Sequence, residues 1–402
     1  MPGHIEKRRK SSYLVIVEGG CDPLTGKRVR VTKAVKGPKR EAERVLHQLI
    51  AEIETGTYID PAKVTLGEYL EHWLEAYAKP NLAPLTFNGY RDVVMKHLLP
   101  ALGSLQLSRI QPMFIQRYYA RALEAGRRDG KGGLSPRSVR YHHAVLREAL
   151  KHAVKWRLIP VNPADAAEPP KPKRPQVKAL GPHDIARILE TADALHHRDR
   201  YLIRAAVYTG MRQGELLALR RDDVGLEAGT IYVRQALQRI PGEGHSFKEP
   251  KTEKGRRATA MPTLLVETLL AVQAEQPQNR KMIAEIGYPY HDHGLVFCNS
   301  DGKPLDRCGV TRRFKTLAAR AGFPDVTFHA LRHSHATVLL AQGVHPKVVQ
   351  ERLGHSTISI TMDTYSHVLP GLQEEAACKL DSAFGQPLGN REAKTRPDRR
   401  VH

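Results

Sequence analysis

The sequence predicts a multidomain α+β protein: a small N-terminal three-stranded sheet with one helix, then a four-helix bundle, then a mainly α-helical region with a small antiparallel sheet. Three observations predict this architecture. A chain of 402 residues is too long for one ordinary hydrophobic core. The apolar periodicity is strand-like near the N-terminus and helical after residue 60. A basic, proline-rich segment then divides the helical region from the last one.

We expect folded units at residues 1–60, 61–165 and 180–385, with a linker at 166–179 and a disordered basic tail at 386–402. In the first unit, Tyr13–Val17 and Arg28–Val35 have strand character, and the turn between them is rich in Gly, Asp and Pro. Residues 4–8 supply a third candidate strand, and apolar residues recur at helical spacing from Pro38 to Glu54.

One face of this sheet would pack on the helix. The other face is predicted to carry Arg28, Arg30 and Lys33 and to contact DNA. The alternative is a solvated edge with ordinary surface charge.

Residues 61–160 are predicted to be helical throughout. A capping-box pattern at Thr65–Glu68 precedes the first helix. Thr86 begins the second helix, Met113–Leu123 forms the third, and Ser135-Pro136 opens a long fourth one. Basic residues of this last helix could line the groove of a duplex, although a solvated face is the alternative: Arg137, Arg140, Arg147 and Lys151.

The segment Ala167–Ala179 is the clearest linker, because clustered prolines prevent a helix and favour extended backbone. A basic linker between two basic domains suggests a clamp that closes around DNA. Beyond it, the predicted helices begin at Gly181-Pro182 and then cover Tyr201–Tyr208, Gln213–Leu219, Thr263–Gln273, Gly309–Ala321, His329–Gln342 and Pro346–Leu353. The predicted strands are Thr230–Ala236, Arg257–Met261 and Leu295–Cys298.

Charge is the strongest compositional signal. The chain carries 63 Lys and Arg against 42 Asp and Glu, a formal net charge of +21. This excess favours a polyanion such as DNA, through phosphate contacts and counterion release. A membrane surface is the weaker alternative, since no basic amphipathic helix has a Trp- or Phe-rich face. Without a membrane-length apolar run or a signal-like segment, we expect a soluble, cytoplasmic protein with no membrane partner.

The segment TGMRQGE spans the end of one predicted helix and the start of the next. Gly210 permits the backbone reversal, which leaves Arg212 at the tip and free to enter a cleft. Glu215 follows three residues later and could hold the arginine in place. Taken alone, this pattern also fits a helix junction with a surface arginine.

A second motif, Pro250-Lys251-Thr252, falls in a charged loop between two predicted strands. Lys251 could reach a minor groove or a scissile bond from there. Lys248 and Lys254 lie in the same loop and are alternatives for this role.

The stretch from His329 to Tyr365 holds the remaining candidates. His329 and Arg332 are three residues apart and share a helical face. A turn at Gly354 presents His355, and a short helix carries Tyr365. Imidazoles, a guanidinium and a phenol in a very basic chain suggest a site for a phosphodiester.

A metal site is not expected. Helical spacing puts His329 and His333 on one face but turns His335 away, and no carboxylate follows nearby. The four cysteines are far apart without a CxxC pair, which is typical of reduced residues and of neither a disulfide framework nor a zinc site.

In their order along the chain, these motifs resemble the tyrosine recombinase (phage integrase) family. The matching segments are TGMRQGEL, PKT, HALRHSHAT and LGHSTISITMDTYSHV. The catalytic resemblance covers about residues 180–385, and a weaker resemblance extends over a helical core-binding (SAM-like) domain and an N-terminal arm-binding domain. The candidate catalytic residues, in family order, are Arg212, Lys251, His329, Arg332, His355 and Tyr365.

The resemblance implies a site-specific DNA recombinase, the integrase of a phage or other integrative element. Tyr365 would attack the scissile phosphorus, so that a 3′-phosphotyrosine ester preserves the bond energy. Arg212 and Arg332 would bind the non-bridging oxygens of the transition state as permanently charged, bidentate donors. Because these guanidiniums stabilise the charge, no metal or other cofactor is expected.

The remaining members have supporting roles. His355 would donate to the same oxygens, and His329 would take part in proton transfer. By resemblance, Lys251 would protonate the leaving 5′-oxygen. Glu215 is predicted to support Arg212 and not to carry a proton.

After Tyr365, apolar residues recur every four positions along a short helix: Leu372, Ala376, Leu380 and Phe384. This helix could pack on its own domain. The resemblance implies instead that it docks in trans on a neighbouring subunit, within a homotetramer bound to double-stranded DNA at core and arm attachment sites. It also makes an excision (directionality) factor and a host DNA-bending protein candidate partners, at the nucleoid of a bacterial host.

Three other functions remain as alternatives. A type IB topoisomerase has similar chemistry, but the layout and the LGHS…Y signature fit it poorly. A non-catalytic DNA-binding or architectural protein would have no reason to keep all six residues. A metal-dependent nuclease would be inhibited by chelators.

Overall fold

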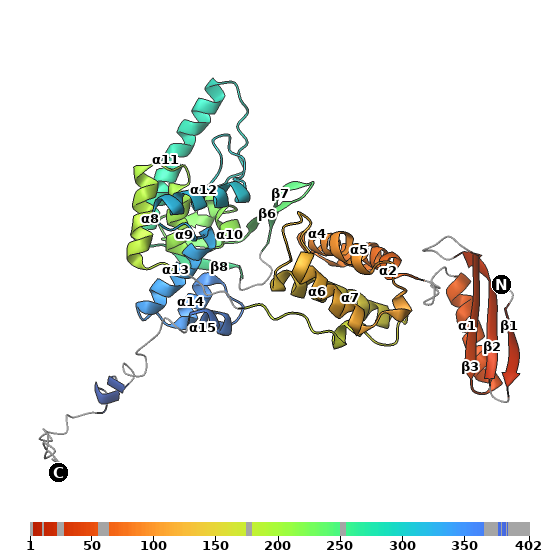
Figure 1. Cartoon of the computed structure of the whole chain (residues 1–402). Coiled ribbons are helices and arrows are strands. Elements are labelled where there is room, and N and C mark those ends of the chain that lie inside the picture. The colour runs from red at the N-terminus through yellow and green to blue at the C-terminus, as the bar shows by residue number, and fades with distance from the viewer. Residues whose placement is uncertain are drawn as a thin grey trace, which may run out of the picture. The chain divides into compact units, whose positions relative to one another are not determined.

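The computed structural model describes residues 3–9, 12–21, 28–54, 64–173, 179–249 and 255–365, together with 377, 378, 380–382 and 384. The chain divides into two compact units, Met1–Arg174 and Pro175–His402 (Figure 1). Among the described residues, no helix is both long and apolar enough to cross a membrane. The multidomain, mainly helical architecture with small antiparallel sheets confirms the predicted fold class.

The first unit begins with the expected three-stranded antiparallel sheet, in the order β1-β2-β3. Its elements are β1 (Gly3–Arg9), β2 (Ser12–Cys21), β3 (Arg28–Lys36) and the covering helix α1 (Lys39–Glu54). Alternate strand residues such as Val15, Val17 and Val31 are buried against Ala42 and Leu49 of the helix. This amphipathic pairing is what the sequence pattern predicts.

The basic residues of β3 do not share one face, which corrects the prediction. Arg30 and Lys33 are both exposed. Because side chains alternate along a strand, Lys33 has the parity of the buried Val31 and Val35, and Arg30 has the opposite parity. The side chain of Arg28 lies outside the described residues.

The rest of the first unit is the predicted helical bundle. Its elements are α2 (Leu66–Trp73), η1 (Leu74–Ala78), α3 (Lys79–Asn81), α4 (Pro84–Val93), η2 (Val94–Leu98), α5 (Leu99–Leu102), η3 (Leu107–Arg109), α6 (Pro112–Ala125), α7 (Pro136–Lys155) and η4 (Pro163–Ala166). The capping box is present, since the carboxylate of Glu68 accepts the backbone N–H of Thr65 at 2.9 Å. Ser135 caps α7 through a 3.1 Å bond from the backbone N–H of Ser138. Tyr69, Trp73 and Tyr119 are buried at the centre.

The exposed basic residues of α7 form one stripe. Arg137, Arg140, Arg147 and Lys151 are all exposed, and their spacing by three, seven and four places them on one helical face. Arg147 pairs with Asp165 at 2.6 Å. Both partners are more than half exposed, so a phosphate could replace the carboxylate at little cost.

The predicted linker begins later than expected. Ala167 is buried with the bundle, and the backbone of Glu168 exchanges two hydrogen bonds with the amide of Gln116, of 3.0 and 3.2 Å. An apolar residue and a paired backbone therefore tie the first linker residues to the bundle. Residues 174–178, which hold the division between the two units, lie outside the described part of the chain.

The second unit is built around α9 (Arg200–Thr209), which packs against other described helices of the unit. The helices of this unit are α8 (Pro182–Ala194), α10 (Gln213–Leu216), η5 (Arg221–Asp223), α11 (Thr263–Glu285), α12 (Arg307–Arg320), α13 (Phe328–Ala341), α14 (Pro346–Leu353) and α15 (Ile358–Tyr365). A small antiparallel sheet has the order β4-β5-β8, with β4 (Val224–Gly225), β5 (Thr230–Val233) and β8 (Arg257–Ala260).

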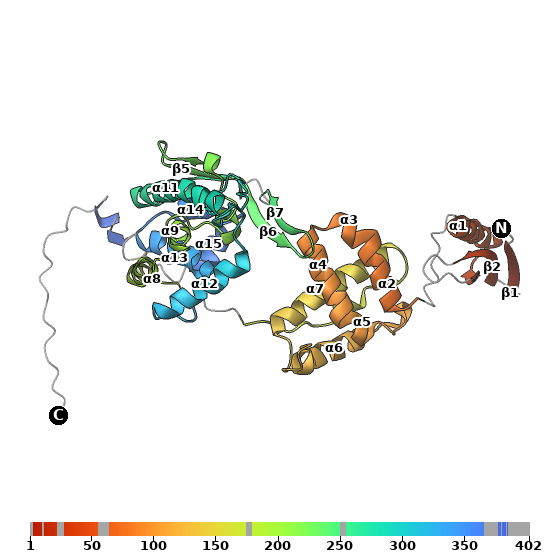
Figure 2. The same cartoon turned by 90° about the horizontal axis from the view of Figure 1, so that it is seen from above.

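The strands of this unit differ from the prediction in two places. The connection between β5 and β8 contains an unexpected hairpin, β6 (Ala236–Ile240) and β7 (Gly244–Lys248), which projects from the helices of its unit (Figures 1 and 2). Its strands are short and polar, so their pattern is weak. Within the described residues, the predicted strand Leu295–Cys298 forms isolated bridges and no ladder: Arg220↔Leu295 and Cys298↔Pro304.

Candidate active site

Arg212 stands at the helix junction that the sequence predicts. Gly210 ends α9 in the left-handed conformation with φ of 63°, and Arg212 is the N-cap residue of α10. A Cβ on Gly210 would lie 2.5 Å from the His335 ring, so only glycine fits this turn. The Arg212 side chain is 45% exposed and is therefore accessible to a ligand.

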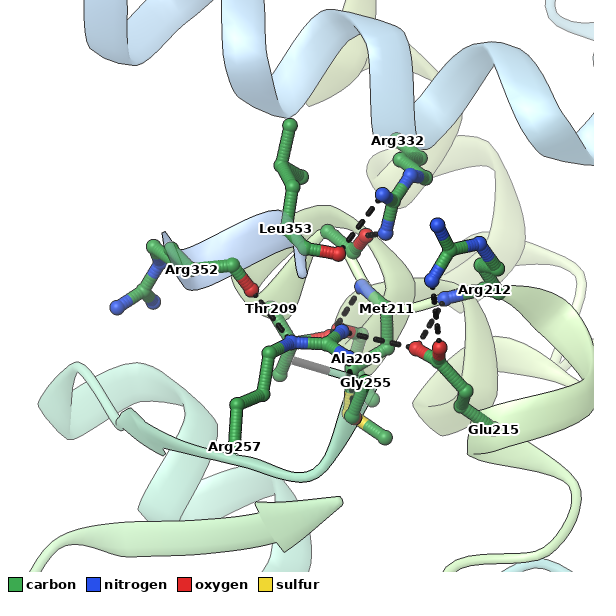
Figure 3. A network of polar contacts seen from close by, with 11 residues as sticks. Ala205, Thr209, Met211, Arg212, Glu215, Gly255, Arg257, Arg332, Arg352 and Leu353 are labelled. Carbon is green, nitrogen blue, oxygen red and sulfur yellow. Dashed lines mark hydrogen bonds and ion pairs between the residues drawn. The ribbon is translucent and has the colours of Figure 1, made fainter. Parts of the chain in front are cut away.

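Glu215 holds Arg212 as expected. Its carboxylate accepts the Arg212 backbone N–H at 3.0 Å and the Arg212 guanidinium at 2.9 Å. A second guanidinium, from Arg257, donates to the same carboxylate at 2.8 Å. Figure 3 shows both arginines directed at Glu215. Burial alone raises the pKa of the Glu215 carboxyl, but Arg257 and Arg212 outweigh it and hold the pKa below its usual value. Glu215 is thus an ionised, buried support.

Arg332 connects two segments that bear other candidates. It is 3% exposed, and its two terminal nitrogens donate to the carbonyls of Gly210 and Leu353, each at 2.8 Å. Figure 3 shows the contact with Leu353. Gly210 lies two residues before Arg212, and Leu353 lies two residues before His355. One buried guanidinium therefore fixes both turns.

His329 lies on α13 with Arg332, and its ring contacts His333 edge-on with centroids 4.7 Å apart. The predicted shared face of these two histidines is confirmed. Burial, followed by the positive charges of Arg332, Arg212 and Arg307, lowers the pKa of His329. The contribution of Arg212 places this imidazole within electrostatic range of the α10 turn.

His355 follows the left-handed Gly354 that ends α14. Its Nδ1 lies 2.9 Å from the hydroxyl of Thr361, on α15. Burial first, then Arg332 and Arg212, lowers the pKa of His355 to about 4. The ring is neutral near pH 7, so when Nδ1 accepts the Thr361 hydroxyl, Nε2 carries a hydrogen that it can donate.

Tyr365 is the last residue of α15, one helical turn after Thr361. This helix contacts α14 and α13, so its backbone is tied to the elements that carry His355 and Arg332. The side chain of Tyr365 lies outside the described residues, as do Lys251 and Lys254. Lys248 is the last residue of β7 and pairs with Ala236.

The structure thus brings four of the six candidates into one region: Arg212, His329, Arg332 and His355. The sequence also matches family models over much of its length. Residues 178–371 match the phage integrase family, and residues 65–123 match its N-terminal SAM-like domain. The chain belongs to the tyrosine recombinase (phage integrase) family. It is a site-specific recombinase, which breaks and rejoins DNA strands.

Relatives of this recombinase span nearly its whole length. A tyrosine recombinase XerC-like protein of Caldanaerobacter subterraneus subsp. tengcongensis is 29% identical over 394 residues, 94% of this chain and 98% of the relative. The ICEBs1 integrase of Bacillus subtilis is 25% identical over 94% of this chain and 99% of its own.

Solved structures share the recombinase fold. The Tn1549 transposon integrase in complex with circular intermediate DNA has a TM-score of 0.66 at 22% identity, over 79% of this chain and 100% of that chain. A lambda integrase dimer bound to a COC′ core site has a TM-score of 0.54 at 20% identity, over 90% of this chain and 95% of that chain. At this level of identity the likeness concerns the fold alone.

Sequence reasoning missed Arg257 and His335 of this recombinase. Strand alternation could have indicated Arg257, because this residue lies on the same strand face as the buried Thr259. A charged side chain on an inward face needs a buried partner, which here is Glu215. His335 donates from Nδ1 to the Val207 carbonyl at 2.8 Å and accepts from Arg352 Nε at 3.1 Å. It is a structural histidine that links α9 to α14.

Within the described part of the chain, no group of three or more His, Cys, Asp or Glu side chains could hold a metal ion. Both ring nitrogens of His335 are used by protein partners, which removes it from any such set.

The buried histidines predict an acid-sensitive fold. Burial, as the first cause, lowers the pKa of His333, His335 and His355 to about 4, against about 6.5 in an unfolded chain. Their stabilising contribution is therefore complete above about pH 6.5 and is lost as the pH falls toward 4. We expect Tm to fall by about 5 °C or more between pH 7.5 and pH 5.

Two matched variants test the origin of this dependence of Tm on pH, the slope of Tm against pH measured by differential scanning calorimetry. His335→Gln keeps an amide donor for Val207 but does not titrate, so its Tm should depend less on pH than that of the native protein. His293→Gln removes an exposed histidine and should leave the slope unchanged. An unaltered slope in the first variant would contradict the assignment to His335.

Proposed function

We propose that this recombinase is the integrase of a phage or other integrative element and that Tyr365 is its nucleophile. The supporting observation is the position of Arg332, whose guanidinium joins the turn before Arg212 to the turn before His355. This arrangement gathers two guanidiniums and two neutral imidazoles in a chain of net charge +21. Such a set suits the negative charge of a phosphodiester transition state.

Cleavage would be a transesterification. The Tyr365 oxygen forms a bond to phosphorus, the bond from phosphorus to the 5′-oxygen breaks, and the DNA remains as a 3′-phosphotyrosine ester. Attack by a 5′-hydroxyl of another strand reverses these steps and rejoins the DNA. One ester replaces another throughout, so the reaction needs no ATP.

The arginines and histidines have distinct roles in this proposal. The Arg212 guanidinium is partly exposed and binds a non-bridging oxygen, and Arg332 adds its charge from the buried side. His355 donates Nε2–H to the same phosphate, because Thr361 occupies Nδ1. His329, which is kept neutral by burial and by nearby arginines, can accept the phenolic proton.

The leaving 5′-oxygen requires a proton, and we assign this role to Lys251 in the loop between β7 and β8. Lys248 and Lys254 are the alternatives in the same segment. Two permanently charged guanidiniums can stabilise the transition state, so the proposal predicts reaction without a divalent metal.

We further propose three functional regions. Residues 1–60 would bind arm-type sites, with Arg28, Arg30 and Lys33 as candidate contacts on more than one surface of the sheet. Residues 61–165 would bind the core site, with the basic stripe of α7 toward the phosphates. Residues 180–385 would form the catalytic domain, and the basic segment before it would allow closure around the duplex.

The active assembly would be a homotetramer on core and arm sites. Leu380 and Phe384 are 58% and 85% exposed, which leaves apolar side chains available to a neighbouring subunit. A lambda integrase tetramer bound to a Holliday junction shares the fold, with a TM-score of 0.54. An excision factor and a host DNA-bending protein would act with the assembly at the bacterial nucleoid.

A joining assay tests this function. Two DNA fragments, each with an attachment site taken from the ends of the element that carries the gene, are incubated with the protein in EDTA. We expect recombinant DNA in which the two fragments are covalently exchanged.

The alternatives give different products in the same reaction. A type IB topoisomerase would relax a supercoiled plasmid without exchange, and an architectural protein would only retard the DNA in a gel. A metal-dependent nuclease would yield broken DNA after Mg²⁺ is added. Any of these outcomes in place of exchange would contradict the proposal.

A further inference from the structure

Arg257, which no predicted role includes, lies at the centre of the polar network of the active site (Figure 3). It is the first residue of β8, and its side chain is 6% exposed. All three guanidinium nitrogens donate to protein acceptors: Nη2 to the Glu215 carboxylate at 2.8 Å, Nε to the Arg352 carbonyl at 2.7 Å and Nη1 to the Gly255 carbonyl at 3.3 Å.

Each of these acceptors belongs to a different segment of the proposed active site. Glu215 supports Arg212. The Arg352 carbonyl is at the end of α14, next to the Leu353 carbonyl that Arg332 binds. Gly255 immediately follows the segment that holds Lys251. Two buried guanidiniums thus bind consecutive carbonyls just before His355, and one of them also binds the segment that follows Lys251.

Charge gives Arg257 a second effect. The Glu215 carboxylate is 5% exposed and has two guanidinium partners, Arg212 and Arg257. With both present, the three groups carry one net positive charge, which resides at the accessible Arg212. Without Arg257, the carboxylate would neutralise Arg212 alone and hold its guanidinium away from a phosphate.

We propose that Arg257 is a positioning residue for DNA cleavage: it neutralises Glu215 so that Arg212 keeps its charge for the scissile phosphate, and it fixes the carbonyl end of α14 before His355. This inference rests on the proposed function, because it assigns Arg212 and His355 to the phosphate. Arg257 itself is occupied by protein acceptors and acts through these neighbours.

The test compares Arg257→Met with the double variant Arg257→Met/Glu215→Gln. Cleavage is measured as the rate of covalent complex formation on a nicked attachment site in EDTA, and DNA affinity is measured separately. Arg257→Met should lower the cleavage rate by about 100-fold, similar to the loss of one preorganised donor, while DNA affinity changes by less than about threefold. The double variant should cleave at least about tenfold faster than Arg257→Met, because the neutral amide that replaces the Glu215 carboxylate does not neutralise the charge of Arg212.

A purely structural role gives the opposite pattern. In that case the double variant would cleave DNA no faster than Arg257→Met alone, and that result would overturn the proposal. Native cleavage rates in Arg257→Met would overturn it as well. If Arg257→Met does not fold, Arg257→Lys serves instead: it keeps the charge but loses the three-acceptor fork, and a native rate in this variant would overturn the role in fixing α14.

Arg313→Met is the matched control. Arg313 makes a comparable two-bond pair with the buried carboxylate of Asp199 in the same unit, at 2.7 and 3.0 Å. The Arg313→Met variant should be less stable than the native protein, but its folded molecules should cleave DNA at the native rate. The native protein separates the two hypotheses: if it forms no covalent complex, the proposed function fails, whereas a complex formed equally well by native protein and Arg257→Met refutes only the role of Arg257.

Discussion

Replacement of Tyr365 by Phe is expected to abolish strand exchange, with a loss of at least about 10⁴-fold, because the ring keeps its shape but has no oxygen to attack phosphorus. DNA affinity should stay within about twofold of the native value, since the phenol is one contact among many phosphate contacts. Both quantities can be measured on the same attachment-site fragment, by joining and by gel retardation.

Tyr288→Phe is the control for this substitution. Tyr288 is 68% exposed and follows α11, so loss of its hydroxyl should leave strand exchange at the native rate. Residual exchange by the Tyr365 variant within tenfold of the native rate would show that another group is the nucleophile.

Replacement of Arg332 by Ala is expected to produce the second largest effect. The change removes a transition-state charge, which costs about 10²–10³-fold in cleavage rate. It also leaves the buried carbonyls of Gly210 and Leu353 without their donor, at a cost of about 1–3 kcal/mol each in the free energy of unfolding. Single-turnover cleavage and thermal unfolding measure the two effects separately.

Arg332→Lys distinguishes charge from geometry. Lysine keeps the charge but cannot donate to both carbonyls from a planar fork, so it should restore less than a tenth of the native cleavage rate. Full activity in this variant would show that charge alone suffices. The control is again an arginine of the same unit, Arg313→Ala, which should destabilise the fold without a comparable loss of cleavage by the folded protein.

Local patterns were sufficient to predict most of the fold. The capping box at Thr65, the Ser135 N-cap and the apolar spacing of α1 and α7 each specify an element through neighbouring residues, and the structure contains all of them. Arg212 and Glu215 were also predictable as a pair, because side chains three positions apart lie close together on a helix.

Long-range partners were less accessible to sequence reasoning. Arg257 meets Glu215 across 42 residues and Arg352 across 95, and no local period marks such a contact. The β6–β7 hairpin was missed because its strands are too short and polar for a clear alternation. Lys33 was predicted to share a face with Arg28 and Arg30. Strand alternation instead gives its side chain the direction of the buried Val31 and Val35.

The central claim is that Tyr365 forms the covalent bond to DNA without a metal ion, and one measurement tests it directly. The native protein is incubated in EDTA with a nicked attachment-site substrate, the covalent complex is digested with nuclease and protease, and the nucleotide-bearing peptide is identified by mass spectrometry. The predicted result is a peptide that carries its nucleotide on Tyr365 through a 3′-phosphate, while the other DNA fragment has a free 5′-hydroxyl. A nucleotide on a different residue, a 5′-linkage, or a complex that forms only after Mg²⁺ is added would contradict the claim.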